Sequence, residues 1–288
     1  MRVQRAVIAT ILLVSALFVH MNGELVDDWA SKQVPREQTE PLSLLGIQAN
    51  EEWLVLQVEF PNSAYSESRA RSLLMGAGSA EEYIEEMTAG SSSLSATLFD
   101  EVWEAPQGVK RWGEDVDGER DHGADGNGAE TLLRDVATDL LEGQDLSRWD
   151  LNNDGVVDRI LILHSSEPQE KGGGVNSLWS HFTGMQEPLV LGDWSVEHFT
   201  IASVHSGLGT VVHEMLHQMC ALDLYDVHSE LPTSNWNGIG DWGLMASGNW
   251  NGNGAIPSLP SSSTLDLIGV QRSIAVEPDI DSTHSISG

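Results

Sequence analysis

The residues with the clearest chemical potential are two histidines and a glutamate at helical spacing. His213 and His217 stand four positions apart, and Glu214 directly follows the first histidine. Residues four apart on a helix lie one above the other on the same face, so both imidazoles can bind a single ion. Glu214 is rotated by about 100° and can sit beside that ion without binding it. This H-E-x-x-H pattern predicts a zinc site whose bound water gives up a proton to the glutamate.

A catalytic zinc ion needs a third protein ligand and keeps its fourth position for water. Asp223 lies six residues beyond His217, and Asp226 and His228 follow shortly after it. The H-E-x-x-H pattern also occurs by chance in helices that bind nothing. The apolar residues around it, the carboxylate at ligand distance and the Gly- and Trp-rich segment that follows favour the zinc site.

A second stretch, residues 150–158, places oxygen-bearing side chains at alternate positions, with Gly155 among them. This order matches the first nine residues of a calcium-binding loop, in which the glycine allows a sharp turn. The acid that closes such a loop is missing, because Leu161 occupies the twelfth position. A structural calcium site and an Asp- and Asn-rich turn before a strand are both open interpretations. The candidate calcium ligands are Asp150, Asn152, Asp154 and Asp158.

The elements that must hold these residues can be predicted from the apolar pattern. Residues 209–223 carry the H-E-x-x-H pattern and repeat their apolar residues at the spacing of an amphipathic helix. Ser79 is expected to cap a helix, and residues 114–128 are expected to form a solvated acidic loop. Strands are predicted at 53–60, 94–103, 159–164, 179–181 and 194–204, and further helices at 80–87, 130–141 and 265–270.

Charge is the most unusual bulk property of the chain. Its 288 residues include 44 acidic and 14 basic ones, which gives a net charge of −30 and a pI near 4.3. A surface this acidic repels nucleic acid and anionic lipid, so we expect neither as a partner. A salt-rich habitat, additional calcium sites and adaptation to acid all fit this composition. Cys220 is the single cysteine, which rules out a disulfide within the chain and favours a buried, unreactive thiol.

The N-terminal residues have the composition of an export segment. Arg2 and Arg5 precede a continuous apolar run at 6–19. This run is short for a membrane span but suits the core of a secretory signal. Residues 1–23 are therefore expected to be a signal peptide or an uncleaved N-terminal anchor, the latter being the one membrane contact that we expect.

The rest of the chain divides by composition into a short polar stretch and one large domain. Residues 24–50 are polar and interrupted by two prolines, which indicates a linker or a short pro-segment. Residues 51–288 are expected to form the catalytic domain, with subdomains at about 51–220 and 221–288.

The chain resembles the immune inhibitor A-like, or M6, family of secreted zinc metallopeptidases, within the metzincin-like group. The similarity extends from about Trp53 to Arg272 and is most specific at 213–226 and 242–248. The latter segment contains Met245 and corresponds to the methionine-containing segment of the family. The resemblance implies an α+β fold of the metzincin-like zincin type. Such a fold has a twisted mixed sheet, a backing helix, an active-site helix and an irregular C-terminal subdomain with a Met-turn.

The resemblance also implies roles for individual residues. Tyr225 is expected to donate a hydrogen bond to the oxyanion, as tyrosines near the site do in some metzincins. The chain departs from the family at Cys220, where the family usually has glycine because the chain leaves the helix there. A side chain at that position costs roughly 1–2 kcal/mol if φ is positive. The zinc ligands implied by the resemblance are His213, His217 and Asp223, and the implied general base is Glu214.

Together these features predict a secreted or surface-located zinc endopeptidase that hydrolyses proteins or peptides. The expected cofactor is Zn²⁺, with Ca²⁺ as a second ion if residues 150–158 bind it. One alternative is a cell-surface binding protein that keeps the fold without catalysis. The intact H-E-x-x-H residues argue against it, since a decaying site usually loses one of them. The other alternative is a zinc hydrolase with a non-protein substrate. The sequence does not indicate an oligomeric state.

Overall fold

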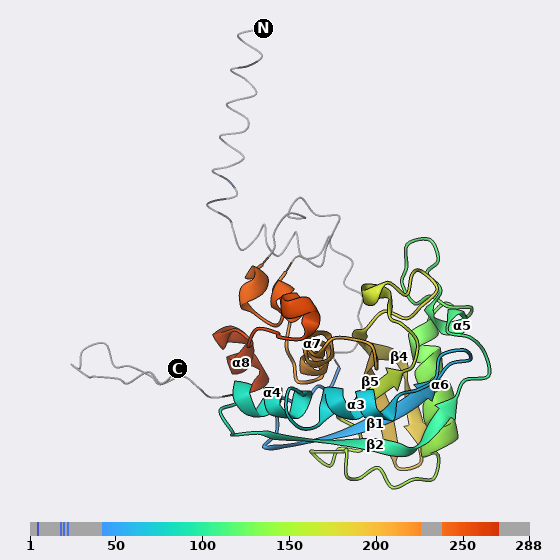
Figure 1. Ribbon diagram of the computed structural model, residues 1–288. Coiled ribbons are helices and arrows are strands. Elements are labelled where there is room, and N and C mark those ends of the chain that lie inside the picture. Colours follow the sequence, from blue (N-terminus) through green and yellow to red (C-terminus); the bar gives the residue numbers. More distant parts are fainter. Residues whose placement is uncertain are drawn as a thin grey trace. The chain divides into compact units, whose positions relative to one another are not determined.

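The computed structural model describes residues 42–225 and 238–270, together with Arg5, Phe18, His20 and Asn22 (Figure 1). From Leu42 onward the described residues form one compact unit. The strands are β1 (Asn50–Glu59), β2 (Ser93–Glu104), β3 (Ile160–His164), β4 (His181–Leu191) and β5 (Trp194–Ser203). The α-helices are α3 (Glu67–Leu74), α4 (Ala80–Met87), α5 (Lys110–Gly113), α6 (Gly128–Leu141), α7 (Leu208–Gln218) and α8 (Ser262–Ile268). The 3-10 helices are η1 (Gln169–Lys171), η2 (Gly240–Trp242) and η3 (Ser247–Gly254).

The strands form one mixed sheet in the order β2-β1-β3-β5-β4. β1 pairs in parallel with both β2 and β3, so that Leu54 lies opposite Thr97 on one side and Ile160 on the other. β3 pairs in parallel with β5, and β4 runs antiparallel beside β5. The described part of the sheet therefore has a parallel centre and one antiparallel edge strand, β4.

Alternating side chains give the sheet two apolar faces, each covered by helices. Along β1, Leu54 and Leu56 enter the cluster that contains the apolar residues of α6. Trp53 and Val55, on the opposite face, enter the cluster formed with α3, α4, α7 and α8. Helix α7 thus lies against the sheet on the face opposite to α6, and Figure 1 shows it beside α3 and α4. The α+β class predicted from the sequence is confirmed.

Most of the predicted elements are present with shifted ends. The side-chain cap predicted at Ser79 is wrong. Ser79 is the N-cap residue of α4, but its side chain makes no capping hydrogen bond. The Ser79 hydroxyl instead donates to the carbonyl of Gly76. The strand predicted at 179–181 is wrong in its extent: β4 runs from His181 to Leu191 and includes a register shift before Leu189. Many residues of β4 are exposed and its pairing is interrupted. A pattern of alternating apolar residues therefore does not predict the whole strand.

The expectation of a solvated loop at 114–128 is also wrong for part of that loop. Asp121 is only 5% exposed, and both of its carboxylate oxygens accept the backbone N–H of Trp179 at 3.1 Å. Burial raises the pKa of Asp121 to about 8, although the hydrogen bond from Trp179 acts in the opposite direction. Asp115 and Glu170 add to the rise by charge repulsion. This acidic loop is therefore partly built into the domain.

The N-terminal stretch is attached to the domain from residue 42 on. The backbone N–H of Ile47 donates to the carbonyl of Ile268 in α8, at 2.8 Å. The carbonyls of Leu45 and Gly46 accept from Arg159 at 2.9 and 3.0 Å. The earlier part of the predicted linker or pro-segment lies outside the described residues, as does almost all of the predicted export segment. Within the part that the structure describes, no helix has the length and apolar character needed to cross a membrane.

Candidate active site

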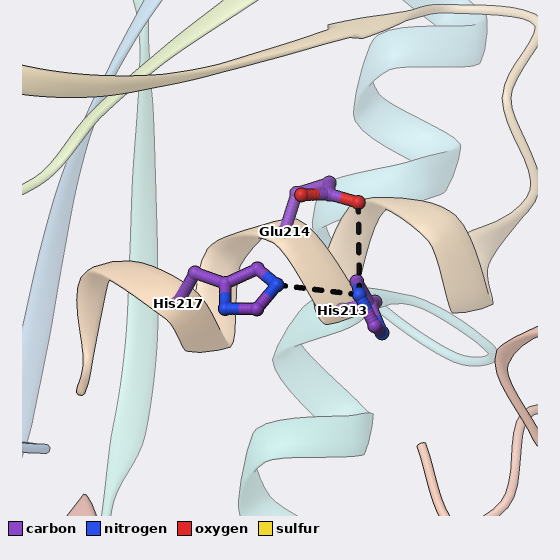
Figure 2. Close-up of side chains that lie close together, drawn as sticks. All are labelled: His213, Glu214 and His217. Atoms are coloured by element: carbon purple, nitrogen blue, oxygen red, sulfur yellow. Dashed lines mark hydrogen bonds and ion pairs between the residues drawn. The ribbon is translucent and has the colours of Figure 1, made fainter. Parts of the chain in front are cut away.

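Helix α7 carries the H-E-x-x-H residues and is anchored by its apolar face. Val211, Val212, Met215 and Leu216 are fully buried in the cluster between the helices and the sheet. Figure 2 shows His213, Glu214 and His217 close together on this helix. The imidazole rings of His213 and His217 lie almost perpendicular, with their Nε2 atoms 3.3 Å apart.

The third residue of the predicted metal site comes from the chain beyond the helix. α7 ends at Gln218, and Cys220 follows with a φ of 75°, the left-handed conformation in which a side chain is strained. This turn brings Asp223 back to the helix. Its Oδ1 atom lies 3.1 Å from Nε2 of His213 and 3.5 Å from Nε2 of His217.

The hydrogen bonds around the histidines decide what these three atoms can bind. Nδ1 of His213 lies 2.9 Å from the carbonyl of Leu244, and Nδ1 of His217 lies 2.9 Å from the carbonyl of Ala221. A carbonyl only accepts, so each Nδ1 carries the proton and each Nε2 presents a lone pair. Oδ1 of Asp223 is buried and has no hydrogen-bond partner among the described residues. The two Nε2 atoms and Oδ1 of Asp223 can therefore all donate electron pairs to one cation.

The separations match those of zinc ligands. Ligand bonds of about 2.0–2.1 Å in a tetrahedral site place the ligand atoms roughly 3.3 Å apart. The three observed separations are 3.1, 3.3 and 3.5 Å. His213, Glu214 and His217 also lie close enough together to hold a metal ion. Glu214 is the outer member, since its Oε1 is 3.8 Å from Nε2 of His213, and Asp223 fits better as the third ligand.

Glu214 is oriented by the edge strand of the sheet. The backbone N–H of Phe182 in β4 donates to its Oε2 at 2.9 Å, which leaves Oε1 on the side of the histidines. Burial raises the pKa of Glu214, and the neighbouring His213 and His217 act in the opposite direction. A carboxylate with a raised pKa is a stronger proton acceptor, as a general base requires. Nothing in the sequence marks Phe182 as its partner.

Tyr225 lines the same cavity as His213 and Glu214. It is 38% exposed, and burial together with the nearby Asp223 raises the pKa of its hydroxyl. It is therefore protonated at neutral pH and can donate a hydrogen bond into the cavity. Asp226 and His228, the other ligand candidates, lie outside the described residues.

The candidate calcium residues form a tight turn before β3. Both carboxylate oxygens of Asp150 accept backbone N–H groups, from Asp154 and Gly155, at 3.0 Å each. Oδ2 of Asp158 accepts the N–H of Leu151 at 2.6 Å, while its Oδ1 is buried with no partner among the described residues. Asn152 donates to Asp154 at 2.8 Å. No close group of three metal-ligating residues is found here in the described ranges, so calcium binding has no support from the geometry.

Comparison with known proteins connects this site to a family. The sequence profile of the immune inhibitor A peptidase M6 catalytic domain matches residues 57–266. The chain is 29% identical over 143 residues to the pre-pro-metalloprotease PrtV of Vibrio cholerae serotype O1, a match that covers 42% of this chain and 15% of PrtV. It is 26% identical over 210 residues to immune inhibitor A of Bacillus thuringiensis subsp. alesti, which covers 60% of this chain and 28% of that protein.

The chain thus spans less than a third of the length of these relatives. The profile covers every described element from α3 to η3 completely, together with the end of β1 and the beginning of α8. This match confirms the resemblance found in the sequence. The chain therefore belongs to the immune inhibitor A peptidase M6 family.

Proposed function

We propose that this domain is a zinc-dependent endopeptidase with His213, His217 and Asp223 as zinc ligands and Glu214 as general base. The observation that carries the proposal is the meeting of three potential ligand atoms 3.1–3.5 Å apart, with a buried carboxylate beside them. A zinc ion held there would lower the pKa of a bound water and polarise a peptide carbonyl.

The residues of the chain then handle the protons. Glu214 accepts a proton from the attacking water and passes it to the amine that leaves. The N–H of Phe182 holds the carboxylate so that one oxygen stays free for this transfer. Tyr225, at the rim of the same cavity, donates to the oxygen that becomes negative at the scissile carbonyl.

The segment beneath the site acts as the Met-turn of the metzincin-like group. Met245 is fully buried and belongs to the same cluster as Met215 of α7. Its neighbour Leu244 supplies the carbonyl that holds His213, and the carbonyl of Met245 accepts the N–H of Leu224, one residue after Asp223. This segment therefore supports two of the three proposed ligands.

Protein and peptide substrates fit the position of β4. β4 is the edge strand of the described sheet, and its residue Phe182 already contacts Glu214. An extended peptide can pair with a free strand edge through its main chain, largely independent of its sequence. This favours an endopeptidase over the zinc hydrolase with another substrate. We also infer export through residues 1–23, a linker or pro-segment before the domain, and a secreted or surface location.

The test combines metal analysis with a variant that replaces the carboxylate of Glu214 by a neutral amide. The protein should contain about one zinc ion per chain and cleave casein, and a chelator should stop the cleavage. Glu214→Gln should keep zinc but lose at least about 100-fold in rate, because the proton acceptor is removed. Glu101→Gln, on the distant strand β2, is the matched control and should behave as wild type. Zinc binding without cleavage would favour a non-catalytic binding protein, and full activity of Glu214→Gln would refute the role of Glu214.

A further inference from the structure

A cavity of about 170 Å³ opens directly beside the proposed catalytic residues. His213 and Glu214 form one wall, and Trp179 and Trp250 form apolar walls. Apart from Ala246 its remaining lining is polar, and three of these polar residues are Glu170, Thr210 and Asn249. The side chain of a substrate residue next to the scissile bond can enter this space. The polar groups of the cavity therefore help to decide which substrate residue is accepted.

Glu170 is the only carboxylate in this lining besides Glu214. Its Oε1 accepts from the hydroxyls of Ser180 at 2.5 Å and Ser206 at 3.1 Å, and its Oε2 lies 3.3 Å from the N–H of Ser180. All of these donors are neutral. No lysine, arginine or histidine of the described residues forms an ion pair with Glu170, so its charge is held in place and not neutralised.

Two residues of the lining also carry a side-chain oxygen without a hydrogen-bond partner. Thr210 is 3% exposed and Asn249 is 7% exposed, and Oγ1 of Thr210 and Oδ1 of Asn249 have no partner in the described part of the chain. Both atoms are buried and do not face the open space of the cavity. The charged acceptor that the lining offers besides Glu214 is therefore the carboxylate of Glu170.

Two cations of the chain lie against the indole rings of the lining. Nζ of Lys171 donates to the carbonyl of Asn253 at 2.7 Å and lies 5.9 Å from the ring centre of Trp250. The guanidinium of Arg120 stacks on the ring of Trp179 at 3.7 Å. Neither residue belongs to the lining itself, and neither donates to Glu170. The net charge of −30 also attracts cationic segments of a substrate to the surface.

We propose that this cavity binds the side chain of a substrate lysine next to the scissile bond, with Glu170 as the residue that selects it; the proposal rests on the proposed peptidase function. An ammonium group is a cation with three N–H donors, and the carboxylate of Glu170 can accept from one of them and offset its charge. The four methylene groups of lysine pack against Trp179 and Trp250. A neutral chain of the same length fills the space but leaves the charge of Glu170 without a counter-ion.

The experiment uses peptide pairs that differ only in lysine or norleucine at each position next to the cleaved bond. For wild type we expect the kcat/KM ratio of lysine to norleucine to reach at least about tenfold at one of these positions, because hydrogen bonds to charged groups are the stronger ones. Glu170→Gln should lower that ratio at least about fivefold, whatever happens to the absolute rates. Glu167→Gln, an exposed glutamate three residues earlier, is the matched control and should keep the ratio.

A second measurement needs no variant. Cleavage sites in casein should be enriched in lysine at one position flanking the cut, and acetylation of the casein lysines should remove those cuts. An equal rate on the two peptides, or a ratio that Glu170→Gln leaves unchanged, overturns the role of Glu170. Cleavage that prefers norleucine overturns it as well. Absence of any chelator-sensitive cleavage overturns the proposed peptidase function itself, and the inference with it.

Discussion

Replacement of Arg159 by methionine should destabilise the domain strongly. Arg159 is fully buried and pairs with Glu51, which is also fully buried, at 2.6 and 3.1 Å. It also donates to the carbonyl of Gln218, at the end of the helix that carries the proposed zinc ligands. Removing one member of a buried ion pair costs about 3–5 kcal/mol, because the other charge stays buried and unpaired.

The structure places the expected loss near the lower end of that range. After the substitution Glu51 keeps two neutral donors, the N–H of Gln48 at 2.7 Å and Nε1 of Trp53 at 3.2 Å. We therefore expect the free energy of unfolding to fall by about 3 kcal/mol. That is a large part of the roughly 5–15 kcal/mol that stabilises a typical domain.

Urea unfolding of the zinc-free protein measures this loss without a contribution from the metal. Arg148→Met is the control, since Arg148 pairs with Glu52 at 2.7 Å while 52% of its side chain is exposed. Its loss should stay below about 1 kcal/mol. The double variant Glu51→Met/Arg159→Met should recover most of the stability, because no charge is then left buried. A loss for Arg159→Met no larger than that for Arg148→Met would refute the reasoning.

Three further predictions follow from other parts of the domain. Cys220→Gly should raise the melting temperature by about 2–4 °C, because relief of the left-handed strain outweighs the entropy of glycine by about 1 kcal/mol; a lower temperature would mean that the Sγ contact with the carbonyl of Leu44, 3.6 Å away, matters more. Asp223→Ala should weaken zinc binding by more than about 100-fold in a chelator competition, and an unchanged affinity would assign the third ligand elsewhere. The raised pKa of Asp121 means that the folded state holds this proton up to about pH 8, whereas the unfolded state loses it near its usual pKa of 3.8. Stability should therefore fall as pH rises through this window, and Asp121→Asn should reduce that slope in urea titrations between pH 5.5 and 8; equal slopes would contradict the burial effect.

The features that the sequence determined by itself are local ones. His213 and His217 share a helix face because their spacing matches the helical repeat, and no other part of the chain is needed for that. The same holds for the apolar repeat of α6 and for the buried strands β1 and β3, whose runs of apolar residues can only be accommodated inside the protein. The position of Asp223 soon after α7 limited the third ligand to a few residues.

Only the tertiary structure decided the contacts between residues that lie far apart in the chain. Phe182 holds Glu214 from 32 positions away, Leu244 holds His213 from 31, and Arg159 pairs with Glu51 from 108. The main chain supplies the partner in the first two cases, and a backbone N–H or carbonyl carries no mark in the residue type. Such contacts arise when the two faces of the sheet are covered and the chain beyond α7 folds back over the helix. The residues that line the cavity around Glu170 come together for the same reason, since they lie on separate segments that only packing brings side by side.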